Sequence, residues 1–238
     1  MPRPQRSPEA IDAIRTEIRN QAIDLIIHCG FNGFSMRKLA ARLGIAAKTI
    51  YNYYTSKDEL YLAILTRGFE HLYAQCLTAW HAHPQSPVNR LHSMGRAYMA
   101  FGLENANLYN LMFTWHVPKY NDYIGTPMEH AAHTELVAAM KVSDLFVSAI
   151  RDASGPENPL GDEDARFHMI LLWSSLHGYI TGMNNTLLDY MHEAPGELSD
   201  KILDTLMQNF EASIYATKRG PVKSLGVPTG QSGRQRRG

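Results

Sequence analysis

The sequence has little cysteine and no long hydrophobic run, which excludes several classes of protein. Only two cysteines, Cys29 and Cys76, occur among 238 residues, and they form no CxxC pair. A disulfide framework is therefore not expected, and a reducing cytoplasm is the predicted compartment. No run of eighteen apolar residues is present, so no membrane span is predicted. The start, MPRPQRSPEA, is basic without an apolar stretch behind it, and we expect no signal peptide.

Common catalytic signatures are also missing. The sequence contains no Gly-rich phosphate loop, no paired-carboxylate motif and no nucleophile elbow. In EHAAH, His130 and His133 stand one helical turn apart beside Glu129 and could grip a metal at two points. No cysteine or further histidine has a helpful spacing, so we interpret them as solvated surface residues. We predict no catalytic residue, no metal and no cofactor.

The two cysteines could form a redox switch. They lack the flanking positive charge that makes a thiol reactive. We interpret Cys29 and Cys76 as small apolar filler.

Charge is balanced overall but unevenly placed. Residues 1–57 hold nine Lys and Arg against four Asp and Glu, whereas residues 58–217 hold eight against nineteen. Residues 218–238 hold six basic residues and no acidic ones. A basic front and an acidic middle suggest two separate roles, the first of which involves a polyanion.

Helical periodicity runs through most of the chain, and the alternation typical of strands is weak. We therefore predict an all-α protein. The expected helices cover about 8–29, 35–43, 46–54, 58–81, 88–105, 107–115, 128–153, 163–190 and 198–217. The tail from 218 to 238 is rich in Gly, Pro and Arg and is expected to be disordered, because it cannot bury enough apolar surface.

Three short helices with a glycine turn before the third make a helix-turn-helix. On a helical wheel of the third helix, Ile50 and Tyr54 point inward. The outward positions are Lys48, Asn52 and Thr55, the flanking ones are Thr49 and Tyr51, and Tyr53 lies on the boundary. Such a face offers donors to base edges and phosphates in a major groove, and the free N–H groups near Ser35 and Arg37 offer a phosphate site. The alternative is a helical corner of a larger enzyme with a solvated basic face.

The stretch FSMRKLAARLGIAAKTIYNYYTSKDELYLAIL resembles the DNA-binding domain of the TetR (tetracycline-repressor-like) transcriptional regulators, over about residues 9–65. The matching pieces are KLAARLGI, TIYNYY and SKDEL. The resemblance implies that DNA is contacted by Thr49, Tyr51 and Tyr53, that Lys57 holds a phosphate and that Arg37 touches the backbone. The third helix begins with Ala46–Ala47 where the family often has a polar cap, and methyl contacts with thymine are one expectation there.

Two further stretches, NLYNLMF and LLWSSLHGYI, resemble more weakly a ligand-binding domain named for its Trp-His-Gly residues, here Trp173, His177 and Gly178. The resemblance implies a helical bundle that dimerises through its last two helices. Small residues at Ser174, Ser175, Gly178 and Gly182 also allow close helix approach, by a second copy or by a neighbouring helix.

Aromatic residues and methionines of the middle region could line an apolar effector pocket or could form an ordinary packed core. The candidate effector-binding residues are Tyr98, Phe101, Phe113, Trp115, Trp173 and His177. His177 could hydrogen-bond a ligand, but satisfying a buried backbone carbonyl is the favoured interpretation.

The two ends of the chain are basic, with Arg3 and Arg6 at one end and RQRR at the other. Such arms could reach phosphates or the minor groove, or could be solvated tails. The two interpretations are balanced for the N-terminal arm, and the solvated tail is favoured for the C-terminal one.

We predict three segments: a helix-turn-helix DNA-binding domain (1–57), a helical effector-binding and dimerisation domain (58–217) and a basic tail (218–238). The predicted function is a ligand-responsive transcriptional regulator. It would be a homodimeric repressor, released from double-stranded, near-palindromic operator DNA by a small, largely apolar effector. An all-α enzyme, a ligand-sequestering protein without a DNA role, and a binding scaffold that senses no ligand are the alternatives.

Overall fold

The computed structural model describes residues 7–113, 117–156 and 159–218, with side chains to residue 214. Within these ranges the chain is helical and contains no strand, which confirms the predicted all-α class. The α-helices are α1 (Pro8–Gly33), α2 (Met36–Leu43), α3 (Ala47–Tyr51), α4 (Lys57–Ala82), α5 (Pro87–Glu104), α6 (Ala106–Phe113), α7 (Glu129–Ala153), α8 (Asp162–Asn184) and α9 (Ser199–Lys218). Short 3₁₀ turns cover Tyr120–Tyr123, Leu188–Tyr190 and Pro195–Leu198.

Serine side chains begin three of these helices. The hydroxyls of Ser7, Ser35 and Ser56 accept the N–H groups three residues further on, at 3.3, 3.3 and 3.0 Å, and so satisfy donors that have no partner inside the helix. The helix α4 begins at Lys57, one residue before the predicted start at Asp58, because Ser56 is the cap and Asp58 lies inside the first turn.

Two glycines separate the first three helices. Gly30 has φ 71° and interrupts the helical path near the end of α1, and Gly44 has φ 65° after α2. Both conformations suit glycine because it has no Cβ. The chain can therefore turn sharply before α2 and before α3, as the helix-turn-helix prediction requires.

Two helices end earlier than the periodicity predicted. The helix α3 ends at Tyr51 rather than Tyr54, because the N–H groups of Tyr53 and Tyr54 both bond to the Ile50 carbonyl and tighten the last turn. The helix α8 ends at Asn184 rather than near residue 190. There the Leu187 N–H bonds to the Gly182 carbonyl, and a 3₁₀ turn follows.

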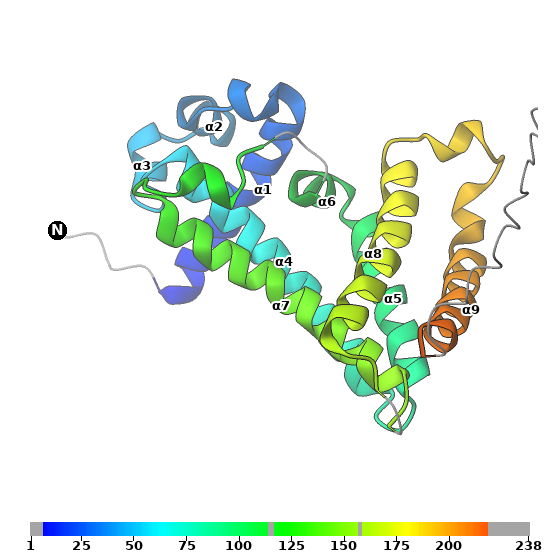
Figure 1. The fold of residues 1–238 in the computed structure, drawn as a ribbon. Helices are drawn as coiled ribbons and strands as arrows, with labels where there is room; N and C mark the ends of the chain where they lie inside the picture. The colour runs from blue at the N-terminus through cyan, green and yellow to red at the C-terminus, as the bar shows by residue number, and fades with distance from the viewer. Residues whose placement is uncertain (1–6, 114–116, 157–158, 219–238) are drawn as a thin grey trace, which may run out of the picture.

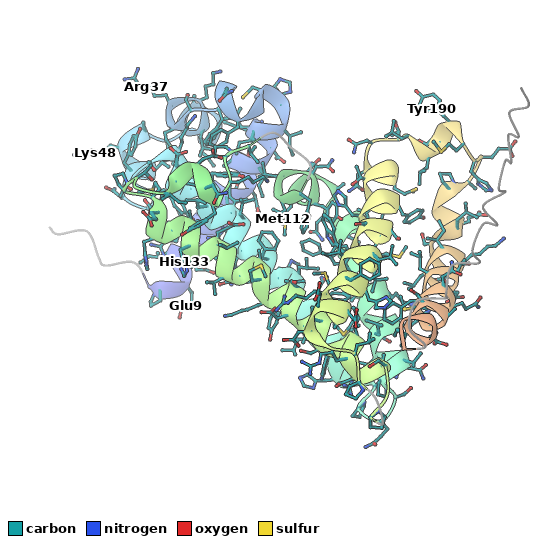
Figure 2. The ribbon with its side chains drawn as sticks, in the orientation of Figure 1. Glu9, Arg37, Lys48, Met112, His133 and Tyr190 are labelled. Carbon is teal, nitrogen blue, oxygen red and sulfur yellow. The ribbon has the colours of Figure 1, made fainter. Side chains whose placement is uncertain are left out.

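Figure 1 shows α1, α2 and α3 grouped at one end of the long helix α4, which then runs beside α7. The helices α5, α8 and α9 pack together further along, and α6 lies between α1 and α8. Gly68 lets α6 approach α4 closely, because a Cβ there would lie 2.7 Å from the sulfur of Met112, labelled in Figure 2. We call the α1–α3 group the head and the helices α4 to α9 the bundle. The head contacts the bundle through α4 and α6.

No helix in the described ranges combines the length and the apolar character needed to cross a membrane.

Candidate nucleic-acid interface and ligand cavity

The third helix is held from behind by apolar packing. Ile50 is fully buried in the head, and Tyr54 is buried beside it. The guanidinium of Arg19 on α1 donates to the Tyr54 hydroxyl at 3.2 Å, so the aromatic anchor is also oriented by a hydrogen bond. The head therefore presents α3 in a fixed orientation even though the helix has only one full turn.

The opposite side of α3 is open. Lys48, Tyr51 and Asn52 are exposed, and Tyr51 keeps 48% of its surface accessible. Thr49 is half-buried, and Tyr53 is half-buried against the core, so the structure turns Tyr53 less outward than the wheel predicted. The resulting surface combines a cation, an amide and a phenol, all of which donate hydrogen bonds.

Basic side chains flank this surface. Figure 2 shows Arg37 and Lys48 at the outer edge of the head, far from Tyr190 of the bundle. Within the described part of the chain, Arg37 and Lys48 form no ion pair with an acidic side chain. Their charges are therefore available to an external anion.

Two other predicted contacts already have partners inside the head. The Ser35 hydroxyl caps α2 through the Lys38 N–H. Lys57, the first residue of α4, has its ammonium 4.4 Å from the centroid of the Phe31 ring on α1, which is a cation–π distance. Lys57 is half-buried, and its position is fixed by that ring.

A cavity of about 200 Å³ lies within the bundle, between α4, α5, α6, α7 and α8. Among the described residues that line it, no side chain carries a charge, and the few polar ones are Tyr98, Ser143 and Trp173. The apolar lining is Phe69, Phe113, Ala139, Met140, Val142, Phe146, Met169, Ile170, Leu172 and Leu176. Its size and composition suit an apolar molecule with few polar groups.

The structure brings some predicted effector residues together and not others. Tyr98, Phe113 and Trp173 line the cavity. Phe101 is fully buried and does not line it, and Trp115 lies outside the described residues. Phe69 and Phe146 were missed, because nothing local distinguishes a lining phenylalanine from an ordinary core one.

His177 joins the cavity wall through a chain of hydrogen bonds. The Trp173 Nε1–H donates to the Tyr98 hydroxyl at 2.8 Å, the Tyr98 and Tyr109 hydroxyls lie 3.1 Å apart, and the Tyr109 hydroxyl lies 2.8 Å from His177 Nδ1. The Trp173 and His177 rings also stack, with centroids 4.8 Å apart. The prediction that His177 satisfies a backbone carbonyl is not what the structure shows, since its ring nitrogens face the hydroxyls of Tyr109 and Thr181.

Burial is the main cause of the pKa shifts in this hydrogen-bonded network. It raises the pKa of Tyr98 and of Tyr109 and lowers the pKa of His177, because each charged form would lose its hydration. All three groups are therefore neutral near pH 7.

Among the described residues, the other candidate sites bring together no set of metal ligands or reactive groups. In the described ranges, no group of three or more His, Cys, Asp or Glu side chains is placed to hold a metal ion. Cys76 is buried, and burial raises the pKa of its thiol to about 12. The basic ends with Arg3, Arg6 and RQRR lie outside the described residues.

Comparison with protein families gives two matches along the chain. Residues 18–64 match bacterial regulatory proteins of the tetR family, and residues 91–206 match the tetracyclin repressor-like C-terminal domain. The first match contains α2, α3 and the start of α4, and the second contains most of the bundle.

Individual relatives agree with these matches. The HTH-type transcriptional activator FasR of Mycolicibacterium smegmatis is 27% identical over 146 residues, which are 61% of this chain and 63% of that protein. The matched region thus spans less than two thirds of FasR.

Two solved structures share the fold. A protein of unknown function from Rhodococcus sp. RHA1 is 22% identical, with a TM-score of 0.64 over 90% of this chain and 98% of that one. The transcriptional regulator FadR of Bacillus subtilis, solved in complex with stearoyl-CoA, is 13% identical, with a TM-score of 0.61 over 81% and 97%.

Proposed function

The chain belongs to the TetR family of helix-turn-helix transcriptional regulators, and from that premise we propose that it is a homodimeric repressor released from operator DNA by a small, largely apolar effector. The observation that carries the DNA role is the exposed set Lys48, Tyr51 and Asn52 on a helix that Ile50 and Tyr54 anchor from behind. We propose that residues 1–57, which include the head, form the DNA-binding part and insert α3 into the major groove, and that residues 58–217 form the regulatory part.

We assign separate tasks to the DNA-facing residues. Thr49, Tyr51 and Asn52 contact base edges, with Tyr53 at the margin, whereas Arg37, Lys48 and Lys57 contact phosphates. The first turn of α2, capped by Ser35, adds backbone N–H donors to a phosphate. Since the proposed partner is DNA, we also propose that the protein works in the cytoplasm.

Dimerisation is proposed through α8 and α9. On α8, Phe167, Ile170 and Leu171 are exposed large apolar residues, with Phe167 58% accessible. The same helix exposes Gly178, where an added Cβ would meet no atom within 4 Å. An apolar stripe beside an open glycine suits the close approach of a second copy, and the two heads would then meet half-sites about 34–36 Å apart or a multiple of that.

The cavity is the proposed effector site, and the apolar lining supports the ligand class. FadR of Bacillus subtilis, which shares this fold, was solved with stearoyl-CoA, a molecule with a long apolar chain. To change operator occupancy from about 99% to about 1%, the effector must bind the released conformation about 10⁴-fold more tightly than the DNA-bound one.

Activation is the second candidate, because FasR, the 27% identical relative, is named as an activator. Deleting the gene and measuring transcripts beside the operator separates the two. Repression predicts that the transcripts rise, and activation predicts that they fall. A catalytic function is not proposed, since the family consists of regulators.

The DNA role is tested by selecting bound duplexes from a random pool with the full-length protein. We expect a near-palindromic consensus and a dimer by analytical ultracentrifugation. A pool that stays random after several rounds, or a monomer bound to a single half-site, would contradict the proposal.

A further inference from the structure

Three helices contribute to one continuous hydrogen-bonded network: Tyr98 from α5, Tyr109 from α6, and Trp173 with His177 from α8. Tyr98 and Trp173 line the cavity, and Tyr109 and His177 lie behind them. Indole nitrogen can only donate, so the direction is fixed at one end: Trp173 donates to the Tyr98 oxygen. The direction of the other bonds then depends on the protonation of His177.

With neutral His177, every donor in the chain is used. His177 Nδ1 accepts from Tyr109, the Tyr109 oxygen accepts from Tyr98, and the Tyr98 oxygen accepts from Trp173. The imidazole proton is then on Nε2, which faces the Thr181 hydroxyl at 3.4 Å. Tyr98 lines the cavity but has no proton left to offer to a ligand.

With protonated His177, the chain must reverse. His177 Nδ1 becomes a donor to the Tyr109 oxygen, so the Tyr109 proton turns toward Tyr98. The Tyr98 oxygen then accepts from both Trp173 and Tyr109, and its own O–H is left over at the cavity wall. A buried donor without an acceptor is unfavourable, so this state requires an acceptor inside the cavity.

Few charges compete for control of His177. The titratable groups facing it are Tyr109 from α6 and, one hydroxyl further, Tyr98 from α5. The other rings against it, Trp173 and Phe113, are uncharged, and no described carboxylate forms an ion pair with it. Burial lowers the pKa of His177. An occupant of the cavity that contacts Tyr98 can therefore influence the proton on His177 through Tyr109.

We propose that the effector is an apolar carboxylic acid whose carboxylate accepts the Tyr98 O–H, and that its binding brings one proton from solvent to His177. A bare carboxylate is costly in an apolar cavity, and the imidazolium at the other end of the chain supplies the opposing charge. One N–H bond forms on His177 and the two tyrosine O–H groups reorient, while no other covalent bond changes. This inference rests on the proposed function, because it concerns the same cavity.

The test is isothermal titration calorimetry of the full chain with straight-chain carboxylic acids from hexanoic to palmitic acid. The alcohol and the methyl ester of each length serve as matched probes. Titrations in two buffers of different ionisation enthalpy, at equal pH, give the number of protons taken up. We expect at least one acid to bind more tightly than its ester, with proton uptake. Its affinity should rise as the pH falls toward the lowered pKa of free His177, by up to about tenfold per pH unit for one proton.

Variants separate the two parts of the proposal. Tyr98→Phe removes the donor, and the preference for acid over ester should fall about ten- to a hundredfold. Tyr109→Phe removes the hydroxyl that links Tyr98 to His177, and His177→Gln removes the titrating group. Both variants should therefore still bind the acid but take up no proton. Tyr179→Phe is the matched control, since that buried hydroxyl bonds to the Pro195 carbonyl and Ser199 instead. Thermal melting of each variant identifies any that fails to fold.

Several results would overturn the inference. Esters or alcohols that bind as well as acids at every length remove the charge requirement, and binding of no acid removes the ligand class. Proton uptake that persists in His177→Gln places the proton on the ligand instead. Binding to a selected operator is measured separately. A protein that binds operator but no acid therefore contradicts only this inference, whereas one that binds acids but no DNA contradicts the proposed function.

Discussion

The head and the bundle organise their polar residues in opposite ways. In the head, Ile50 and Tyr54 are buried so that Lys48, Tyr51 and Asn52 can face solvent. In the bundle, polar groups from three helices are hydrogen-bonded to one another beside an apolar cavity, with Tyr98 and Tyr109 buried and His177 half-buried. The first arrangement suits a large charged partner that approaches from outside, and the second suits a small molecule that binds in the cavity.

The largest effect is expected from removing the anchor of α3. Ile50→Ala should lower the free energy of unfolding by about 2–5 kcal/mol, because it leaves a cavity at a fully buried position. Operator binding should weaken as the head loosens, while ligand binding in the bundle persists. Thermal melting with both binding assays checks this. Ile45→Ala, at a partly exposed position of the same head, is the control, and equal losses in the two variants would show that Ile50 is no anchor.

A smaller effect is expected from removing a side chain on the open face. Tyr51→Ala should cost about 1–3 kcal/mol of specific operator binding and change the preferred sequence, with unfolding unchanged. Fluorescence anisotropy on operator and random duplexes measures the affinity for each and therefore the specificity. Tyr190→Ala removes an 88% exposed tyrosine from the bundle and should have no effect. An equal loss on both duplexes for Tyr51→Ala would mean that it does not contact bases.

The junction between the two regions gives the third prediction. Ser56→Ala removes the cap of α4 and should destabilise the protein by about 1 kcal/mol. Ser86→Ala is the matched control, because Ser86 holds the cap position of α5 without a side-chain hydrogen bond. Chemical denaturation compares the two. Equal stability of both variants would indicate that the Ser56 bond contributes nothing.

The smallest effect concerns a single phosphate contact. Lys48→Gln should weaken binding to operator and random DNA alike and reduce the slope of log K against log salt by about 0.9. Binding measured over a salt series checks the slope. Lys201→Gln, an exposed bundle lysine, serves as the control. A change that appears only on the operator would assign Lys48 to base recognition instead.

More of the structure of the head than of the bundle could be predicted from the sequence. The glycine turn and the apolar spacing of the third helix are local, so they predicted the helix-turn-helix and the inward packing of Ile50 and Tyr54. The exact end of α3 was missed, because a carbonyl that accepts two N–H groups leaves no signature in residue types.

The bundle depends on packing between distant segments. Tyr98, Phe113 and Trp173 could be proposed as cavity residues because they are aromatic, but so could Phe101, which packs in the core instead. The bond between Tyr109 and His177 joins positions 68 residues apart, and no periodicity within one helix predicts it.

Insertion of α3 into DNA is tested most directly by measuring the binding of full-length protein to a selected operator and to a scrambled duplex of equal length, across a salt series. We expect at least about 10³-fold tighter binding to the operator near physiological salt, with log K falling linearly as log salt rises. Equal affinity for the two duplexes, or no binding to either at low salt, would contradict the claim that α3 enters DNA.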